Sequence, residues 1–226
     1  MAGFERIPEP ALMDDPAQVD AYASADWSEA HDRLMRQIAE HFPRETISGL
    51  FLNLGCGSGD DTFRFLREFP GASVIAVDGA ARMLDHARAD LLAKFPEFHQ
   101  RVEFHQAYIP GADIPVREYA GVISNSLLHH FDDPVLFWAA VREHTREGSR
   151  IFVGDLRRPA SVQDADHLVN EYARDAPEIL REDFRNSLLA AFTPQEVGSQ
   201  LGQAGLAELK VHSVGDRHMI IAGVRN

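Results

Sequence analysis

Leu52-Asn53-Leu54-Gly55-Cys56-Gly57-Ser58-Gly59-Asp60 is the stretch of sequence that decides the fold. The apolar run at 50–54 ends in a turn with glycine at every second position, and residues 60–69 then carry apolar side chains at helical spacing. Because glycine has no Cβ and the start of a helix exposes free N–H groups, the backbone of such a turn can approach a ligand closely. The stretch predicts a strand, a ligand-binding turn and a helix.

The spacing of these glycines narrows the kind of ligand. In a dinucleotide-binding turn, G-x-G-x-x-G, the third glycine or alanine would stand where this chain has Asp60. A phosphate-cradling loop requires Gly-Lys-Ser or Gly-Lys-Thr, which the turn lacks. The spacing therefore argues against both of these nucleotide sites.

Apolar runs alternate with helical patterns from residue 50 to residue 155. The sequence predicts strands at 50–54, 73–77, 102–104, 121–124 and 151–155, and helices at 60–69, 80–95 and from Pro134 to near Gly148. The chain closes with two β-rich runs, 209–214 and 218–224, which predict a hairpin. Alternating strands and helices form parallel units covered on both faces. The predicted fold is α/β: a three-layer, doubly wound, mostly parallel sheet with a C-terminal antiparallel hairpin strand and an inserted helical lid.

The remaining segments complete a single domain over residues 1–226. Residues 1–17 are rich in proline and lack periodicity, which predicts a mobile lead-in. Residues 18–42 form an N-terminal helical segment, with Asp26 or Ser28 as a cap or an interruption. Residues 156–193 carry two further helical patterns between the fifth strand and a helix at about 194–204, and we expect this insertion to form a lid or a substrate wall.

Composition and charge restrict the partners. The formal net charge is −13 without a dense Lys/Arg cluster, so binding to nucleic acid or to an anionic membrane surface is not expected. No apolar run approaches the roughly 20 residues of a membrane span, and the start lacks a secretory pattern. Cys56 is the only cysteine, so an intramolecular disulfide is impossible. A cytoplasmic protein, monomeric or homodimeric, is expected.

Two further stretches bear on the ligand. Residues 74–78 read as a strand that ends in Asp78, 19 positions after Gly59, and a carboxylate at such a strand end can accept hydrogen bonds from both hydroxyls of a ribose. Residues 119–134 contain a fourth strand followed by Leu-His-His-Phe-Asp-Asp-Pro. The carboxyl end of that strand borders the crevice where ligands bind in open α/β sheets.

Taken together, these stretches resemble the class I, Rossmann-like S-adenosylmethionine-dependent methyltransferases of the small-molecule type, over roughly residues 50–155. The resemblance implies transfer of the methyl group of S-adenosylmethionine to an unidentified small molecule by in-line displacement, with S-adenosylhomocysteine as product. It also implies which residues hold the cofactor: Tyr22, Gly55, Cys56, Gly57, Asp78, Gly79, Met83, Gln106, Ala107, Asn125 and Ser126. Among these, Asp78 holds the ribose, and Met83 lies against the adenine.

Two positions depart from the family pattern. Asn53 stands where the family usually has Asp or Glu, so recognition of the cofactor's ammonium group is expected to be weaker or mediated by water. Residues 104–108 lack the family's usual Gly-Asp, and Gln106 is the candidate partner for the adenine amino group in its place.

The methyl donor is already activated by its positive charge, so alignment of the reactants matters more than a general base. His129 is the first candidate base, because an unperturbed imidazole titrates near pH 6.5. Asp155, at the tip of the fifth strand, is the second, and His130, Tyr22 and Tyr172 follow. No metal is predicted at the adjacent histidines, since no acidic or cysteine partner stands at ligand spacing in the sequence.

Alternative functions stay open at this point. The chain could be a catalytically inactive sensor or partner protein that binds S-adenosylmethionine without turnover. A remoter alternative is an NAD-dependent oxidoreductase, against which the glycine spacing argues. Aminopropyl transfer on the same fold is remoter still. Binding of S-adenosylhomocysteine compared with NAD, and its release on turnover, would separate these functions.

Overall fold

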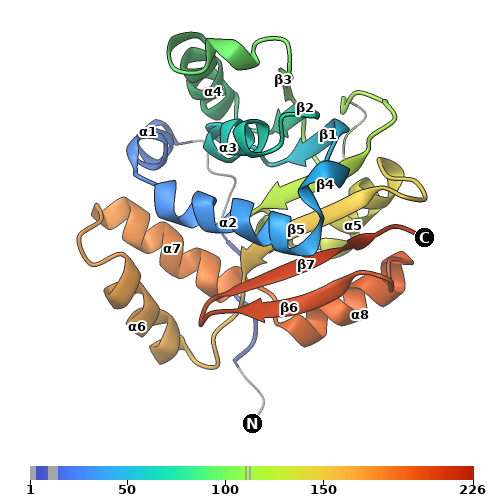
Figure 1. Ribbon diagram of the computed structural model, residues 1–226. Coiled ribbons are helices and arrows are strands. Elements are labelled where there is room, and N and C mark those ends of the chain that lie inside the picture. Colours follow the sequence, from blue (N-terminus) through green and yellow to red (C-terminus); the bar gives the residue numbers. More distant parts are fainter. Residues whose placement is uncertain (1–3, 10–14, 110, 112) are drawn as a thin grey trace.

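The computed structural model describes residues 4–9, 15–109, 111 and 113–226, and its framework is a seven-stranded sheet (Figure 1). The strand order is β3-β2-β1-β4-β5-β7-β6. Strands β1 to β5 pair in parallel, whereas β7 runs antiparallel to β5 and to β6. The strands are β1 (Gly49–Leu54), β2 (Ala72–Asp78), β3 (Val102–Gln106), β4 (Gly121–Asn125), β5 (Arg150–Leu156), β6 (Lys210–Val214) and β7 (His218–Val224). The predicted fold class is confirmed.

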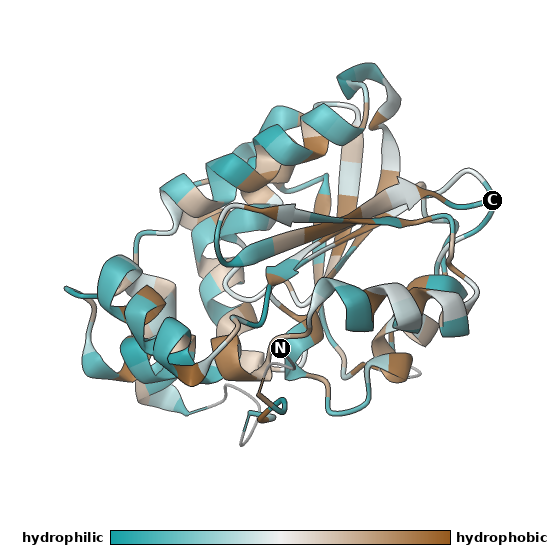
Figure 2. Cartoon of the chain, turned by 90° about the horizontal axis from the view of Figure 1, so that it is seen from below, coloured by the Kyte–Doolittle hydropathy of each residue, from teal (hydrophilic) through white to brown (hydrophobic). Residues whose placement is uncertain are grey.

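Eight α-helices lie in the described part of the chain: α1 (Pro16–Ser24), α2 (Ser28–His41), α3 (Asp60–Glu68), α4 (Ala81–Ala93), α5 (Pro134–Glu143), α6 (Val162–Tyr172), α7 (Glu178–Ala190) and α8 (Pro194–Ala204). The sheet separates them because successive strand residues point to opposite faces. Phe51 of β1 packs in a core with α2 and α3, while Leu52 and Leu54 pack in a second core with α5 and α8. Figure 2 shows the apolar sheet between helices whose polar faces point outward.

The predicted helix boundaries hold where a cap fixes them. Asp133 accepts a hydrogen bond from the backbone N–H of Val135 and caps α5, whose first residue is Pro134, as the sequence predicts. The predicted end of α5 near Gly148 is wrong. The helix ends at Glu143, and Gly148 instead takes a positive φ of 86° in the turn that enters β5. A glycine after a helical pattern can therefore mark the next turn instead of the helix end.

The first part of the chain, predicted as a mobile lead-in, lies against other elements of the fold. Residues 4–9 lie along α7 and the 3₁₀ turn η3 (Leu128–His130), with the N–H of Ile7 donating to the carbonyl of Leu189 at 3.1 Å. The Arg6 guanidinium donates to the carbonyls of His129 at 2.8 Å and Phe131 at 2.9 Å. A segment that has no periodicity of its own therefore makes hydrogen bonds to the folded core, and its mobility stays a prediction. Residues 1–3 and 10–14 of the predicted lead-in lie outside the described residues.

The predicted helical segment at 18–42 consists of α1 and α2, separated at residues 25–27. Helix α1 contacts both α4 and α7 and thus crosses the carboxyl end of the sheet. The insertion at 156–193 supplies α6 and α7, which pack on each other through a separate apolar cluster. Helix α7 also contacts η3, so the insertion and the N-terminal helices border the same edge (Figure 1). None of the helices in the described ranges has the length and apolarity needed to cross a membrane.

Candidate active site

The glycine-rich turn after β1 has a backbone that only glycine adopts easily. Gly55, Gly57 and Gly59 have φ values of 72°, 50° and 86°. A Cβ on Gly55 would lie 2.8 Å from the side-chain carbons of Leu127, so the turn packs tightly on the chain that follows β4. A Cβ on Gly57 would meet only the Tyr22 ring, at 4.0 Å. The backbone at Gly57 is therefore open on the side that Tyr22 faces.

Asp78 is bonded directly to this turn. One carboxylate oxygen accepts from the N–H of Gly57 at 2.8 Å, and the other accepts from the N–H of Ala80 at 2.8 Å. Each carboxylate oxygen has two lone pairs, so both retain capacity for a further donor. Burial raises the pKa of Asp78, and the two backbone hydrogen bonds partly offset that effect. The side chain predicted to hold a ribose thus stands at the strand end, with its orientation fixed by the backbone.

Tyr22 and Met83 close one side of the turn. They pack with Val19 and Ala80 in a small apolar cluster that joins α1 to α4. Burial raises the pKa of the Tyr22 hydroxyl, and the charges of nearby aspartates, among them Asp78, add to the shift. Met83 is therefore part of an apolar wall beside Asp78, next to the open side of Gly57.

The chain after β3 runs beside the Asp78 turn. The Gln106 amide donates to the carbonyl of Gly79 at 3.1 Å, and the N–H of Ala107 donates to the carbonyl of Asp78 at 3.0 Å. Ala107 is buried, whereas Gln106 is exposed. These residues, together with buried Cys56, meet at the edge of the sheet that carries Asp78.

The end of β4 forms the opposite side. Ser126 has a φ of 53°, which is unusual for a residue with a Cβ, and its N–H donates to the carbonyl of Gly154 at 2.8 Å. A Cβ on Gly154 would lie 3.2 Å from the amide oxygen of Asn125, so a glycine on β5 makes room for that side chain. The backbone strain at Ser126 occurs where the resemblance places the methionine part of the cofactor.

His129 and Asp155 form a buried pair. The Nδ1 atom of His129 lies 2.6 Å from a carboxylate oxygen of Asp155, and each residue is 2% exposed. The same oxygen accepts from the N–H of Leu156 at 2.6 Å. Burial by itself would lower the pKa of His129, but the charge and hydrogen bond of Asp155 outweigh it, and Glu9 adds to them, so the pKa is raised. Since a carboxylate oxygen accepts hydrogen bonds, we assign a proton to Nδ1, and Nε2 is the ring atom directed away from Asp155.

A carboxylate from the N-terminal segment lies at these histidines. Glu9 is ion-paired with Nδ1 of His130, accepts from the Ser187 hydroxyl at 2.6 Å, and lies 3.8 Å from Nε2 of His129. Glu9, His129 and His130 each offer a ligand atom within 4.8 Å of one another. No acidic partner is expected here from the sequence, because Glu9 is more than a hundred residues away in the chain. Only the fold brings it to the pair, so no local signal could have indicated it.

A second residue missed from the sequence is Asp61, near the start of α3. The residue is 7% exposed, and its carboxylate accepts from the Asn53 amide at 3.3 Å and from the Thr62 hydroxyl at 3.3 Å. Burial raises the pKa of Asp61. Asn53 is fully buried, and its amide nitrogen also donates to Thr62 at 2.8 Å. The acid absent from position 53 is thus present eight residues later, against the same side chain.

Asn53→Asp, which restores the acid usual in the family, should destabilise this chain. Two buried carboxylates would face each other across the present 3.3 Å contact between Asn53 and Asp61, and they cannot both ionise there without cost. We expect the free energy of unfolding at pH 7 to fall by about 1–3 kcal/mol. Because protonation relieves the repulsion, the difference from the parent chain should shrink as the pH is lowered toward 5. Denaturant unfolding at both pH values measures this.

The matched control exchanges the two residues. Asn53→Asp combined with Asp61→Asn restores one acid and one amide, so it should recover most of the lost stability. If the double variant is as unstable as the sum of the single variants, the two side chains are not coupled.

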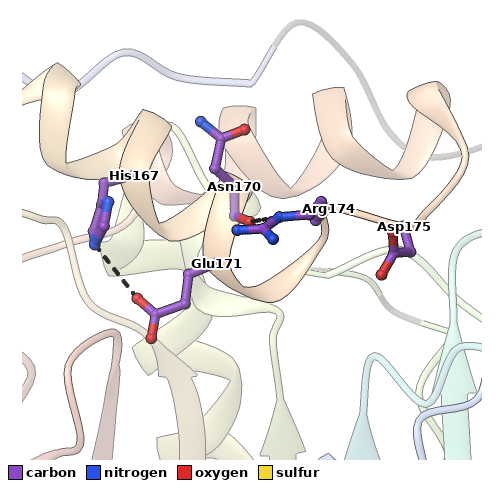
Figure 3. Close-up of a pocket in the computed structure, with 5 residues that line it drawn as sticks. All are labelled: His167, Asn170, Glu171, Arg174 and Asp175. Carbon is purple, nitrogen blue, oxygen red and sulfur yellow. Dashed lines mark hydrogen bonds and ion pairs between the residues drawn. The ribbon is translucent and has the colours of Figure 1, made fainter.

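Two other features lie apart from this cluster. The Tyr172 hydroxyl, a weaker candidate base, donates to Asp216 at 2.6 Å and is not brought to the histidines. Figure 3 shows a surface hollow lined by residues of α6 and the turn after it, in which His167 pairs with Glu171. None of its lining residues belongs to the predicted cofactor or acceptor site.

Comparisons with known proteins bear on the identity of the fold. Residues 52–151 match a family model described as a methyltransferase domain. The chain is 33% identical over 113 residues to a malonyl-[acyl-carrier protein] O-methyltransferase from Priestia megaterium, a match that covers 50% of the chain and 38% of the relative. It is 25% identical over 167 residues to a trans-aconitate 2-methyltransferase from Deinococcus radiodurans, covering 70% of the chain and 58% of the relative. The chain therefore matches about two fifths and three fifths of the lengths of these relatives.

A solved structure of an O-methyltransferase family protein from Burkholderia thailandensis superposes with a TM-score of 0.68 at 18% identity, over 94% of this chain and 61% of that one. At this identity the likeness concerns the fold. The family model at residues 52–151 includes the glycine turn, Asp78 and the fourth strand. The resemblance stated from the sequence is thus confirmed: residues 52–151 match a methyltransferase domain, and the chain is similar to S-adenosylmethionine-dependent methyltransferases of the class I, Rossmann-like kind.

Proposed function

We propose that this chain is an active enzyme that transfers the methyl group of S-adenosylmethionine to a small organic acid. The observation that carries the proposal is the Asp78 carboxylate, bonded to the N–H of Gly57 beside the open side of the glycine turn. A carboxylate so placed matches the paired hydroxyls of a ribose.

The residues at the carboxyl edge of the sheet fit the cofactor in shape and charge. Gly57 leaves space beside its backbone, and the Met83 wall offers an apolar surface for a nucleobase. Asp60, Asp61 and Asp78 are close enough to act on the Tyr22 hydroxyl, and their negative charge suits a cationic sulfonium. In this assignment Asp78 holds the ribose, Met83 and Gln106 border the adenine, and Asn125 and Ser126 face the methionine part.

When bound, S-adenosylmethionine supplies a methyl group already activated by the positive sulfur. The protein must then align the acceptor and exclude water, which can lower the barrier by about 7–11 kcal/mol. Helices α1 and α7 contact each other above the site, and we assign the role of a lid to α7 with α6. Such a cover would shield the methyl group from water.

His129 is the proposed catalytic residue on the acceptor side, and Asp155 is a positioning residue. Asp155 bonds Nδ1 at 2.6 Å, which leaves Nε2 as the atom that contacts the acceptor. For a hydroxyl acceptor Nε2 would accept the proton, as the sequence analysis expects. For a carboxylate acceptor, which is already ionised at neutral pH, the charged imidazole would hold the anion.

The acceptor class is supported by the relatives. By their names, they act on a malonyl group and on trans-aconitate, which are both carboxylic acids. The matches provide no support for an NAD-dependent oxidoreductase or for an inactive sensor. We therefore propose a carboxylate oxygen as the methyl acceptor.

The experiment has two arms. Calorimetry of the purified chain with S-adenosylhomocysteine and, separately, with NAD tests the cofactor: we expect binding of the first and none of the second. A panel of di- and tricarboxylic acids, incubated with the chain and S-adenosylmethionine, tests turnover through release of S-adenosylhomocysteine. Cofactor binding without release from any acid would favour the sensor, and absence of binding would remove the proposal altogether.

A further inference from the structure

The side chains around Glu9 form a cradle for a carboxylate. We define the cradle as His129, His130 and Ser187, which surround the Glu9 carboxylate at the distances given above. The side chain of Glu9 is 11% exposed, so it fills the cradle from within the protein. Burial would raise the pKa of this carboxyl, but the hydrogen bond and charge of His130 and the charge of His129 outweigh that effect, and the pKa is lowered. The cradle therefore stabilises an ionised carboxylate.

We propose that this cradle is the acceptor-carboxylate subsite, and that Glu9 occupies it until an organic acid displaces it. The inference rests on the proposed function and deepens it, since it names the side chains that recognise the acceptor. The Glu9 oxygen nearest His129 lies 3.8 Å from Nε2, the atom that Asp155 directs toward the acceptor. Glu9 thus stands where an acceptor oxygen must be held.

The charges around the cradle favour an anion. Asp155 balances the charge of a protonated His129, so the pair presents an N–H donor at Nε2 without leaving a net buried charge. Arg6, on the same N-terminal segment as Glu9, donates to the carbonyl of His129. The acidic groups near the cradle include Glu9 itself, Asp155, Asp78 and Asp183 of α7. Burial raises the pKa of Asp183, and the charge of Glu9 adds to the shift.

The same side chains could also be read as a cation site. The contacts favour an anion, because both histidines already meet a carboxylate: Nδ1 of His130 is ion-paired with one oxygen of Glu9, and Nε2 of His129 lies 3.8 Å from the other. Two N–H donors suit the two oxygens of a carboxylate.

A carboxylate held here requires no base. One of its oxygen lone pairs forms the new O–C bond to the methyl group, the electron pair of the broken C–S bond stays on sulfur, and the sulfonium becomes a neutral thioether. No proton is released. The role of the cradle is therefore to hold and orient the acceptor.

Glu9→Gln tests the subsite without the cofactor. The probe is malonate, with neutral malonamide as its matched control, and binding is measured by calorimetry and by the imidazole proton shifts of His129 and His130. Removing the internal carboxylate should tighten malonate binding about tenfold, because a site that is mostly occupied by its own side chain binds in proportion to its free fraction. Malonamide should bind to neither form.

Glu5→Gln is the control variant, since Glu5 lies on the same segment, is exposed and carries the same charge. It should bind malonate as weakly as the parent chain. Glu9→Ala serves as a second variant, and thermal melting checks that each remains folded.

Equal malonate affinity in the parent chain, Glu5→Gln and Glu9→Gln would overturn the proposal, as would equal binding of malonamide. Zn²⁺ binding that requires Glu9, with no effect on malonate, would assign the cluster to a cation instead. Because the test uses no cofactor, its failure leaves methyl transfer intact, whereas absence of cofactor binding would remove the proposed function and leave the cradle as a carboxylate site without an acceptor role.

Discussion

Asp78→Asn should weaken the binding of S-adenosylhomocysteine by about a hundredfold. A carboxylate that accepts hydrogen bonds from two ribose hydroxyls contributes about 1.5–3 kcal/mol for each bond, and the amide keeps only one acceptor oxygen. The side chain cannot reorient to compensate, since its two oxygens are already fixed by the N–H groups of Gly57 and Ala80 at 2.8 Å. Calorimetry of the variant and the parent chain measures the change.

The substitution also disturbs the turn, so its effect on the ribose must be separated from its effect on the backbone. One of the two N–H groups loses its acceptor, which costs about 1–3 kcal/mol of stability, and thermal melting reports that loss. A 2′-deoxy analogue of S-adenosylhomocysteine completes a double-mutant cycle, in which one change is made in the protein and the other in the ligand. It should bind the parent chain less tightly than the natural ligand, while the variant should barely distinguish the two.

Asp85→Asn is the matched control, because Asp85 lies on α4 close to Asp78 in sequence and its side chain is 76% exposed. It should leave both affinities unchanged. If Asp78→Asn binds the natural ligand as tightly as Asp85→Asn does, the ribose assignment is wrong.

Much of the fold was predictable because each part has a local physical signal. The strand, glycine turn and helix at 49–68 are encoded within twenty residues, and the strain at Gly55 and Gly59 confirms why glycine stands there. The end of α5 was not predictable from Gly148, since the choice between a helix end and the following turn depends on how β5 enters the sheet.

The site was predictable only in part. Asp78 and His129 follow strands, and the carboxyl ends of parallel strands meet at one edge, so their proximity follows from the topology. Glu9 and Asp61 were missed for different reasons. Glu9 reaches the histidines through tertiary contacts of a segment that has no hydrophobic periodicity. Asp61 lies near the start of α3, where an acidic residue is ordinary in an amphipathic helix, so the sequence gives no reason to expect it to be buried. Neither role has a local signal.

The pH dependence of turnover should show which protonation state of His129 acts. Asp155 and Glu9 raise the pKa of His129, so its charged form is fully present below the ordinary value near 6.5 and is lost as the pH rises through the raised value. If the imidazolium holds a carboxylate acceptor, kcat/KM is highest at low pH and falls through that value. A general base would give the opposite slope, with kcat/KM rising over the same interval.

Asp155→Asn shifts this transition in a known direction. It removes the nearest charge that raises the pKa of His129, so the fall in kcat/KM should move to lower pH, and the imidazole proton shifts should titrate with it. A merely structural Asp155 would change the melting temperature and leave the pH at which kcat/KM changes where it was.

His129→Gln should lower kcat/KM about a hundredfold at pH 6.5, since it removes a charged donor aimed at the acceptor. The single variant leaves Asp155 buried without its partner, which costs about 3–5 kcal/mol and endangers folding. His129→Gln combined with Asp155→Asn avoids that unpaired charge, and its kcat/KM should fall by the same factor as in the single variant. His167→Gln, on the exposed face of α6, is the control and should retain full activity. Activity in the double variant equal to that of His167→Gln would mean that the dyad only packs against the sheet, because a group that holds the acceptor cannot be removed without loss of rate.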